Sequence, residues 1–200
     1  MKIYFIRHGE SESDVKEKYD GDYDDHLTTL GIQQAEELAT SELLQDIEKI
    51  YTSPKIRAQE TASVLQNKLG NTPIEVLEGL AEQDIYGAFL ELGKDQPEEE
   101  YRKLGEVLVN KDVAYDGAET YWDFKDRILK SISELLNAPQ KNFAVITHGG
   151  PIRCLFRELI KTHEVDSLGN GAIIEIEINT SKGIQLGKTI NIILKPRNSI

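Results

Sequence analysis

The feature that most constrains the fold is a pair of short apolar runs, at residues 3–6 and 143–147, each of which leads directly into a histidine. The first run is followed by Arg-His-Gly (residues 7–9), and the second by His-Gly-Gly (residues 148–150). Short runs rich in strand-forming residues are typical of strands buried on both faces, as in parallel sheets that helices cover on both sides. The pair therefore predicts an α/β fold.

Helical patterns separate these strands from each other and from a third short strand, which we expect at residues 49–52. Ser53 followed by Pro54 is the pattern of an N-cap with proline at the first helical position, and Gly70 is placed to end that helix. Strands that alternate with helices indicate a three-layer sandwich with a mostly parallel sheet. The expected helices cover residues 30–44, 54–69, 97–108, 119–136 and 151–160.

The C-terminal part of the chain has a different pattern. Residues 172–178 partly alternate, and residues 190–194 follow after a turn near residues 181–183, which predicts an antiparallel hairpin at the sheet edge. An exposed strand edge can pair with a second copy of the chain, so a homodimer is one expectation. Residues 80–118 have the weakest pattern, and we expect them to form a small helical lid inserted in a single domain that spans residues 1–200.

Composition argues against several functional classes. A net charge of −12 is unfavourable for binding nucleic acid, which requires a basic face. No apolar run approaches the roughly 20 residues that cross a bilayer, so no membrane partner is expected. The single cysteine, Cys154, cannot form an internal disulfide. This fits a reducing compartment, and a cytoplasmic location is expected.

Two histidines and two arginines are predicted to meet at one edge of the sheet. The carboxyl ends of parallel strands line the ligand crevice of an open α/β sheet, which brings His8 and His148 together. Arg7 precedes the first histidine, and Arg57 lies in the first turn of the helix after the strand at residues 49–52, where the helix dipole favours anions. Guanidinium groups match the oxygens of a phosphoryl group, so these residues predict a phosphate site.

Single histidines and arginines outside such a convergence more often have a structural role. Arg57 taken alone would be expected to pair with Glu36 or Glu60 on a solvated helix face. His26 and His163 do not follow a predicted strand into a glycine, and a structural role is expected for both.

A metal site and a cysteine nucleophile are less favoured than a phosphate site. The chain has no His-Glu-x-x-His motif or other closely spaced cluster of metal ligands, and Arg7 would place a positive charge beside a metal cation. Cys154 lies in an apolar helical run, where a small buried side chain is expected. A metal site is therefore not expected.

At these residues the chain resembles the histidine phosphatase superfamily, the phosphoglycerate-mutase-like phosphatases. The similarity covers residues 3 to about 178, and no single motif carries it. The matching segments, in chain order, are Arg7-His8-Gly9-Glu10-Ser11, Leu27-Thr28 with Gly31 and Gln34-Ala35, Ser53-Pro54 with Arg57-Ala58 and Thr61-Ala62, Gly117-Ala118-Glu119-Thr120, and Thr147-His148-Gly149-Gly150.

The resemblance implies a two-step mechanism without a metal or organic cofactor. His8 would attack phosphorus through a neutral ring nitrogen and form a phosphohistidine. His148 would act with it in catalysis by stabilising the charge on the phosphoryl oxygens. The residues implied in phosphate binding are Arg7, Ser11, Asp14, Arg57 and Gly149.

Two positions depart from the family pattern. The general acid falls on Glu82 when counted from Leu80, but one additional residue precedes Gly87, so Asp84 is held as the alternative. Asp14 stands where the family usually has asparagine, and a carboxylate cannot donate a hydrogen bond to phosphate. Asp14 is therefore expected either to turn away, toward an arginine, or to weaken phosphate binding.

The predicted activity is the hydrolysis of small phosphomonoesters, with a small phosphorylated metabolite as the partner. Residues 80–118 are acidic and contain few cations, which is unfavourable for holding the second phosphate that a mutase requires. The alternatives are phosphoryl transfer of the phosphoglycerate mutase type, and a phosphate-binding module with impaired catalysis.

Overall fold

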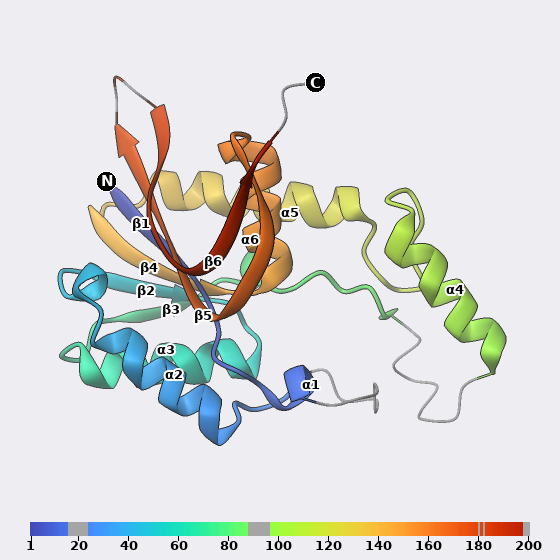
Figure 1. Ribbon diagram of the computed structural model, residues 1–200, viewed down its shortest axis with the longest axis horizontal. Coiled ribbons are helices and arrows are strands. Elements are labelled where there is room, and N and C mark those ends of the chain that lie inside the picture. The colour runs from blue at the N-terminus through green and yellow to red at the C-terminus, as the bar shows by residue number, and fades with distance from the viewer. Residues whose placement is uncertain (16–23, 88–96, 180, 182, 198–200) are drawn as a thin grey trace.

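The computed structural model describes residues 1–15, 24–87, 97–179, 181 and 183–197. A six-stranded sheet forms its centre, with the strands in the order β3-β2-β4-β1-β5-β6 (Figure 1). The strands are β1 (Lys2–Arg7), β2 (Lys49–Thr52), β3 (Ile74–Val76), β4 (Asn142–Thr147), β5 (His163–Asn179) and β6 (Gly183–Pro196).

The sheet has a parallel half and an antiparallel half that meet at β1. This strand pairs in parallel with β4 and antiparallel with β5, and the register joins Arg7 to Thr147. Because the two parallel strands end side by side, the residues that follow them, His8 and His148, emerge at the same edge. The predicted convergence of the two histidines is confirmed.

Helices cover both faces of the sheet, which gives the three layers seen in Figure 1. On one side lie α2 (Thr29–Ala39) and α3 (Ile56–Lys68), and on the other lie α5 (Tyr121–Leu136) and α6 (Gly149–Leu155). Successive residues of a strand point to opposite faces. In β1, Tyr4 and Ile6 join the core under α2 and α3, whereas Ile3 and Phe5 join the core under α5 and α6. A strand that is apolar on both sides thus serves two cores.

The boundaries of several helices differ from those predicted. The helix expected at residues 30–44 is divided, because α2 ends at Ala39 and Ser41 caps a separate 3₁₀ turn, Glu42–Leu44. The helix expected from residue 54 begins at Ile56, because the Ser53 hydroxyl bonds to His148 and accepts from the Lys55 amide without capping the helix. The last predicted helix starts earlier, at Gly149, and ends in a π-helical turn, Phe156–Ile160.

The C-terminal hairpin is confirmed, but it is longer than predicted. β5 is interrupted by register shifts against β6, the largest of them between Leu168 and Ile173. These irregularities remove the strict alternation by which its first half would have been predicted as a strand. β6 forms the sheet edge, in agreement with the prediction.

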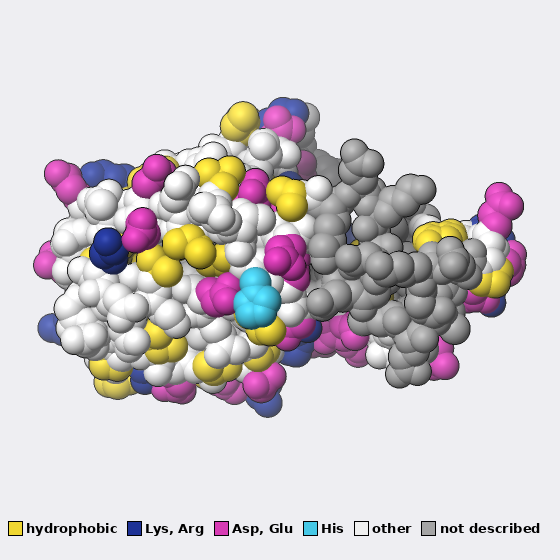
Figure 2. Space-filling model, turned by 90° about the horizontal axis from the view of Figure 1, so that it is seen from below, with side chains coloured by type: hydrophobic (Ala, Val, Ile, Leu, Met, Phe, Trp, Pro, Cys, Tyr) yellow, Lys and Arg dark blue, Asp and Glu magenta, His cyan; other side chains and the backbone are white. Residues whose placement is uncertain are grey.

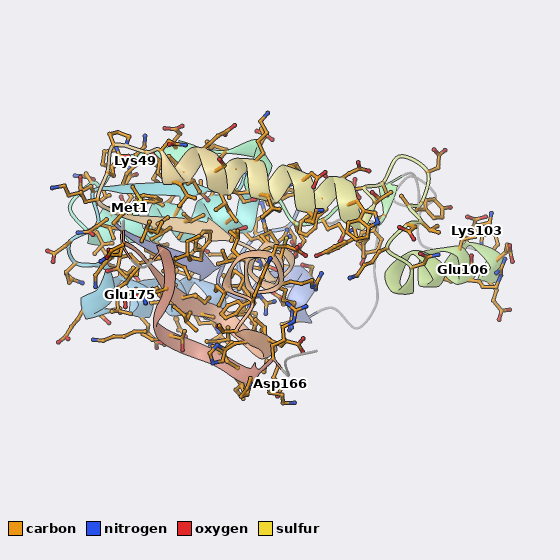
Figure 3. All side chains as sticks on the ribbon, turned by 90° about the horizontal axis from the view of Figure 1, so that it is seen from above. Met1, Lys49, Lys103, Glu106, Asp166 and Glu175 are labelled. Carbon is orange, nitrogen blue, oxygen red and sulfur yellow. The ribbon has the colours of Figure 1, made fainter. Side chains whose placement is uncertain are left out.

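The segment predicted to be a lid, residues 80–118, is described in part. It begins at the end of a 3₁₀ turn, Glu78–Leu80, and contains α4 (Glu98–Val109), whereas residues 88–96 lie outside the described residues. Lys103 and Glu106 on α4 lie at the opposite end of the molecule from Met1 (Figure 3). A lid role for this segment stays a prediction.

The chain carries a net charge of −12. On the face formed in part by α2, acidic side chains are spread among exposed hydrophobic ones (Figure 2). Leu30 and Ile32 are among the exposed residues of α2. No helix in the described parts of the chain is long and apolar enough to cross a membrane.

Candidate active site

The loop after β1 lies tightly against the first turn of α2. A Cβ atom at Gly9 would lie 2.4 Å from the Gly31 carbonyl oxygen, and one at Gly31 would lie 1.9 Å from the Glu10 carbonyl oxygen. The Gly9 amide also donates to the Thr61 hydroxyl on α3, at 3.1 Å. These close approaches hold the loop in place and explain why glycine stands at both positions.

His8 follows β1 and is only 4% exposed. Its Nδ1 lies 2.7 Å from the Gly9 carbonyl oxygen, which can only accept, so Nδ1 carries the proton and Nε2 keeps its lone pair. Arg57 Nε donates to this Nε2 at 3.2 Å. Burial, and then the positive charge of Arg57, lower the pKa of His8 to about 4. The ring is therefore neutral at neutral pH.

His148 lies beside His8, with the ring centroids 5.0 Å apart. Its Nε2 is 2.7 Å from the Ser53 hydroxyl, while its buried Nδ1 has no hydrogen-bond partner within the part of the chain that the structure describes. Burial lowers the pKa of His148 well below its usual value, and charge on His8 and Arg57 acts in the same direction. The site thus contains two neutral imidazoles.

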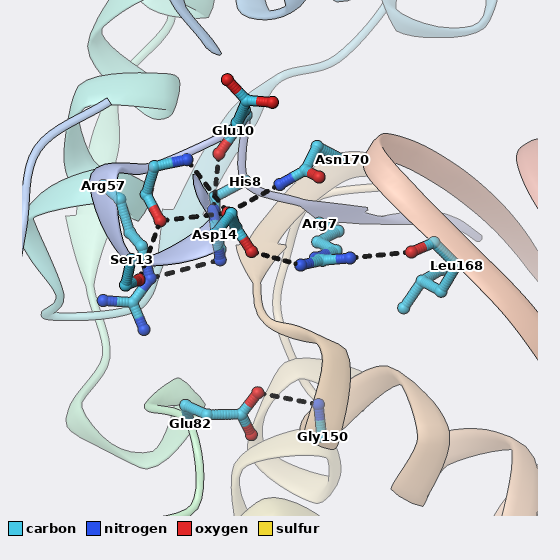
Figure 4. Close-up of polar contacts among 12 residues, drawn as sticks. Arg7, His8, Glu10, Ser13, Asp14, Arg57, Glu82, Gly150, Leu168 and Asn170 are labelled. Carbon is cyan, nitrogen blue, oxygen red and sulfur yellow. Dashed lines mark hydrogen bonds and ion pairs between the residues drawn. The ribbon is translucent and has the colours of Figure 1, made fainter. Parts of the chain in front are cut away.

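Arg7 and Asp14 form an ion pair at the mouth of the site (Figure 4). Arg7 Nη2 donates to Asp14 at 2.8 Å, and Nη1 donates to the Leu168 carbonyl at 2.7 Å. The other carboxylate oxygen of Asp14 accepts from the Ser11 amide, the Ser11 hydroxyl and the Asn170 side chain. Despite the opposing effect of partial burial, these bonds and the charge of Arg7 lower the pKa of Asp14. Asp14 therefore pairs with an arginine, which was one of the two outcomes expected from the sequence.

Arg57 projects from the first turn of α3 into the site and is 3% exposed. Besides its bond to His8, its Nη1 lies 3.4 Å from a carboxylate oxygen of the buried Asp25. The surface pairs considered from the sequence are not formed, since Glu60 accepts from His26 and the Leu27 amide, and Glu36 pairs with Lys68. Arg57 is a buried component of the site.

Glu82 lies across the site from His8 (Figure 4). Its carboxylate accepts from the Gly150 and Gln83 amides, both at 2.9 Å. Burial raises the pKa of Glu82 and outweighs these bonds and the charge of Arg57. A Cβ at Gly150 would lie 2.0 Å from the carboxylate, so glycine there makes room for it. Asp84 is not in the site, because its side chain accepts from the Tyr86 and Gly87 amides.

A side chain of α5, Arg127, holds the backbone around Glu82 in place. Arg127 donates to the carbonyl oxygens of Gly79, Ala81 and Glu82, at 3.0 to 3.3 Å. Its guanidinium also forms a bidentate pair with Glu119, with both bonds at 2.7 Å. Neither Arg127 nor the role of Glu119 was predicted from the sequence.

These side chains line a cavity of about 280 Å³. Of the residues predicted for the site, it is lined by Arg7, His8, Asp14, Arg57, Glu82 and Gly149. Ser11 is placed differently, because it is fully buried and bonds to Asp14, while its neighbour Ser13 lines the cavity. His148 is fully buried and does not line the cavity. Arg153 was not predicted from the sequence, although its place one turn of helix after Gly149 was the signal that could have located it.

The arrangement is suited to phosphoryl chemistry. A neutral imidazole with an available lone pair is a nucleophile, and two guanidinium groups next to it can neutralise phosphoryl oxygens. A carboxyl with a raised pKa can hold a proton for a leaving group.

Comparison with known proteins agrees with this chemistry. The model of the histidine phosphatase superfamily, branch 1, matches residues 3–187. The chain is 30% identical to a 2,3-bisphosphoglycerate-dependent phosphoglycerate mutase of Parvibaculum lavamentivorans, covering 91% of this chain and 92% of that protein. It is also 30% identical to the phosphatase PhoE of Bacillus subtilis, covering 78% and 76%.

Among solved structures, the alpha-ribazole phosphatase of Shigella flexneri is similar over 96% of both chains, with a TM-score of 0.74 and 25% identity. The chain thus shares its fold with a solved phosphatase structure, and it is similar in sequence to both phosphatases and mutases. The chain belongs to branch 1 of the histidine phosphatase superfamily.

Proposed function

We propose that this protein is a phosphatase that hydrolyses small phosphomonoesters through a phosphohistidine on His8, without a metal or organic cofactor. The observation that carries the proposal is the hydrogen bond between His8 Nδ1 and the Gly9 carbonyl oxygen. Because this bond keeps the proton on Nδ1, the lone pair is on Nε2, the nitrogen that Arg57 contacts. Glu82, whose pKa is raised by burial, lines the same cavity.

In the first step, His8 Nε2 forms a bond to phosphorus while the bond from phosphorus to the ester oxygen breaks. Arg57 Nε, which donates to Nε2 in the resting site, transfers its hydrogen bond to a phosphoryl oxygen as the lone pair attacks. Arg7 Nε and His148 Nδ1 are buried and have no hydrogen-bond partner among the described residues. A phosphoryl oxygen would satisfy each of these nitrogens. Glu82 gives its proton to the leaving alkoxide.

In the second step, Glu82, now ionised, takes a proton from water as the water oxygen attacks phosphorus. The N–P bond breaks, the electron pair returns to Nε2, and inorganic phosphate leaves. The product site therefore regains its starting protonation state, with a neutral His8 and a protonated Glu82.

The test is to mix the protein with a ³²P-labelled aryl phosphate, quench the reaction, and look for an acid-labile, base-stable label on the chain. We expect the label on His8, and we expect it to be absent from His8→Asn. Release of phosphate without any labelled intermediate would contradict the phosphohistidine step.

A second assay separates hydrolysis from phosphoryl transfer. The protein is offered 3-phosphoglycerate with a bisphosphate primer, beside the aryl phosphate. We expect phosphate release to be faster than isomerisation, and the reverse order would assign the chain to the mutases.

A further inference from the structure

A second cavity, of about 340 Å³, adjoins the catalytic one, and Arg153 lines both. Four cationic side chains line the second cavity, against the one carboxylate of Glu164. They are Lys111, Arg153, Arg157 and Arg197. This local excess of positive charge contrasts with the net charge of −12 on the whole chain.

Two of these cations are not neutralised by a carboxylate. Lys111 and Arg157 both lie over the ring of Tyr121, at 4.7 and 4.8 Å from its centroid, and neither forms an ion pair with any residue that the structure describes. Glu158 accepts from the Tyr121 hydroxyl and is not within ion-pair distance of either. The exposed Arg102, by contrast, pairs with Glu99 and Glu106 on its own helix.

Backbone contacts fix the walls of this cavity. Arg153 Nη1 donates to the Val165 carbonyl oxygen at 2.6 Å, which holds its guanidinium at the boundary between the two cavities. Arg197 Nη1 donates to the Arg157 carbonyl oxygen at 3.0 Å and so ties the end of the hairpin to the π-helical turn. These three arginines therefore belong to α6, its π-helical extension and the end of the β5–β6 hairpin, all of which are parts of the folded core.

We propose that the second cavity binds another anionic group of the substrate, a carboxylate or a phosphate, while the phosphoryl group to be removed lies at His8. Cations that face a concave, partly desolvated wall attract anionic oxygens more strongly than exposed cations do. The preferred substrate would then be a phosphomonoester with a second negative group at its far end. The proposal rests on the proposed function for the reaction at His8, but the second cavity can be tested by itself.

The test compares alkyl phosphates of increasing chain length that end in a carboxylate, in a phosphate or in a neutral hydroxyl. The measured quantity is the ratio of kcat/KM for the anionic substrate to that for the hydroxyl-ended substrate of equal length. We expect a maximum at one length, with a ratio above roughly fivefold, since a partly exposed charge-assisted contact contributes on this order. The carboxylate and phosphate series show which of the two groups is preferred.

Charge-removing variants give the matched control. Lys111→Gln and Arg157→Gln are expected to lower the ratio toward one, whereas Lys68→Gln, an exposed lysine on α3, keeps the wild-type ratio. Thermal unfolding checks that each variant is folded. A ratio near one at every length, or a ratio unchanged in both cavity variants, would overturn the proposal while leaving the phosphatase activity intact.

A binding measurement distinguishes this failure from failure of the proposed function. Inorganic phosphate is titrated into the ¹⁵N-labelled protein, and the arginine Nε–Hε signals are followed. We expect the Arg157 and Arg197 signals to shift, and we expect smaller shifts in Lys111→Gln. This result would support the second cavity even if no phosphomonoester is hydrolysed. Shifts confined to Arg7 and Arg57 would count against it.

Discussion

At the residue scale, the chemistry of the site depends on how the two oxygens of Asp14 are used. One oxygen holds Arg7 Nη2, and the other accepts three hydrogen bonds, from Ser11 and Asn170. Arg7 is thereby oriented, but part of its charge is neutralised by the carboxylate. An incoming phosphate dianion meets a weaker positive field than two unpaired arginines would provide.

Asp14→Asn is accordingly expected to raise kcat/KM for an aryl phosphate by about twofold to tenfold, because the amide removes a negative charge and leaves Arg7 unneutralised. Steady-state kinetics at low ionic strength are the measurement, and added salt should reduce the gain. Glu12→Gln serves as the control, because Glu12 is exposed and lies with Asp14 in the short helix α1 (Glu12–Val15). A loss of tenfold or more in Asp14→Asn would show that orienting Arg7 matters more than its charge.

Glu82 and Asp84 are two residues apart, yet only Glu82 faces the cavity, so they make a matched pair. Glu82→Gln should lower kcat/KM, which reports the steps up to departure of the leaving group, by about 100-fold or more for an alkyl phosphate, because an alkoxide leaves poorly without a proton. The loss for p-nitrophenyl phosphate should be smaller, about tenfold or less, since that leaving group needs little protonation. Asp84→Asn should change neither rate by more than about twofold. Equal losses on both substrates would remove Glu82 from the role of general acid.

Which residues could be predicted depended on how near in sequence their partners lie. His8, His148 and both arginines follow strand ends or open helices, so a linear pattern located them. Asp25 and Arg127 were not located, because Arg57 and the carbonyl groups of segment 79–82, which they contact in the site, lie 32 and 45 to 48 residues away. No local motif marks either side chain. The sequence could not decide between Glu82 and Asp84 as the general acid, since both belong to a segment without a regular pattern. Only the structure shows that Glu82 faces the cavity.

At the scale of elements, α5 positions the general acid through one side chain. Arg127 spans from the helix to three carbonyl groups of the segment 79–82 and is itself oriented by Glu119. A planar guanidinium can serve all these acceptors together, whereas an ammonium group cannot. The helix and the preceding Gly-Ala-Glu-Thr segment therefore belong to the support of the site.

Arg127→Lys is expected to lower kcat/KM for alkyl phosphates by about tenfold, with a smaller effect on p-nitrophenyl phosphate, because the change acts through Glu82. A merely structural role would lower both activities equally, so the comparison of leaving groups identifies positioning. Arg102→Lys, which alters exposed pairs on α4, is the control and should behave as wild type. Measurements of kcat/KM on both substrates, with melting temperatures for each variant, complete the test.

Among the elements, the amphipathic helix α5 and three parallel strands, β1, β2 and β4, were predicted well, because each carries an uninterrupted pattern. The full length of the hairpin was not. The first half of β5 contains charged and small residues, and its pairing depends on β6 and on bulges that only the tertiary structure specifies. β3 has three residues, too few for a periodicity to be read.

At the scale of the whole molecule, two buried neutral histidines connect the active site with stability. The pKa of His8 is lowered to about 4, so between about pH 4 and its unfolded value near 6.5 the unfolded chain binds more protons than the folded one. Stability from this residue is therefore present above pH 6.5 and is lost as pH falls toward 4. His148 acts in the same direction.

The stability difference between wild type and His8→Gln should therefore depend on pH. The wild-type free energy of unfolding, relative to that of His8→Gln, is expected to rise from pH 4.5 to 6.5 and then level off, since glutamine does not titrate. Urea unfolding of both proteins at several pH values measures this difference. Because Glu82 is present in both proteins, its opposite contribution to the pH dependence of stability cancels in the difference. A difference that stays constant across this range would mean that His8 is not held neutral by the fold.

The position of β1 between β4 and β5 has a consequence for synthesis of the chain. Ile3 pairs with Phe143 on one side and with Ile176 on the other, so both partners of the strand that carries the nucleophile are made more than a hundred residues later. During translation His8 therefore leaves the ribosome well before these partners and has no sheet to join. The chain through β5 must emerge before β1 is paired on both sides, so the nucleophile is held in place only after this long stretch has been made.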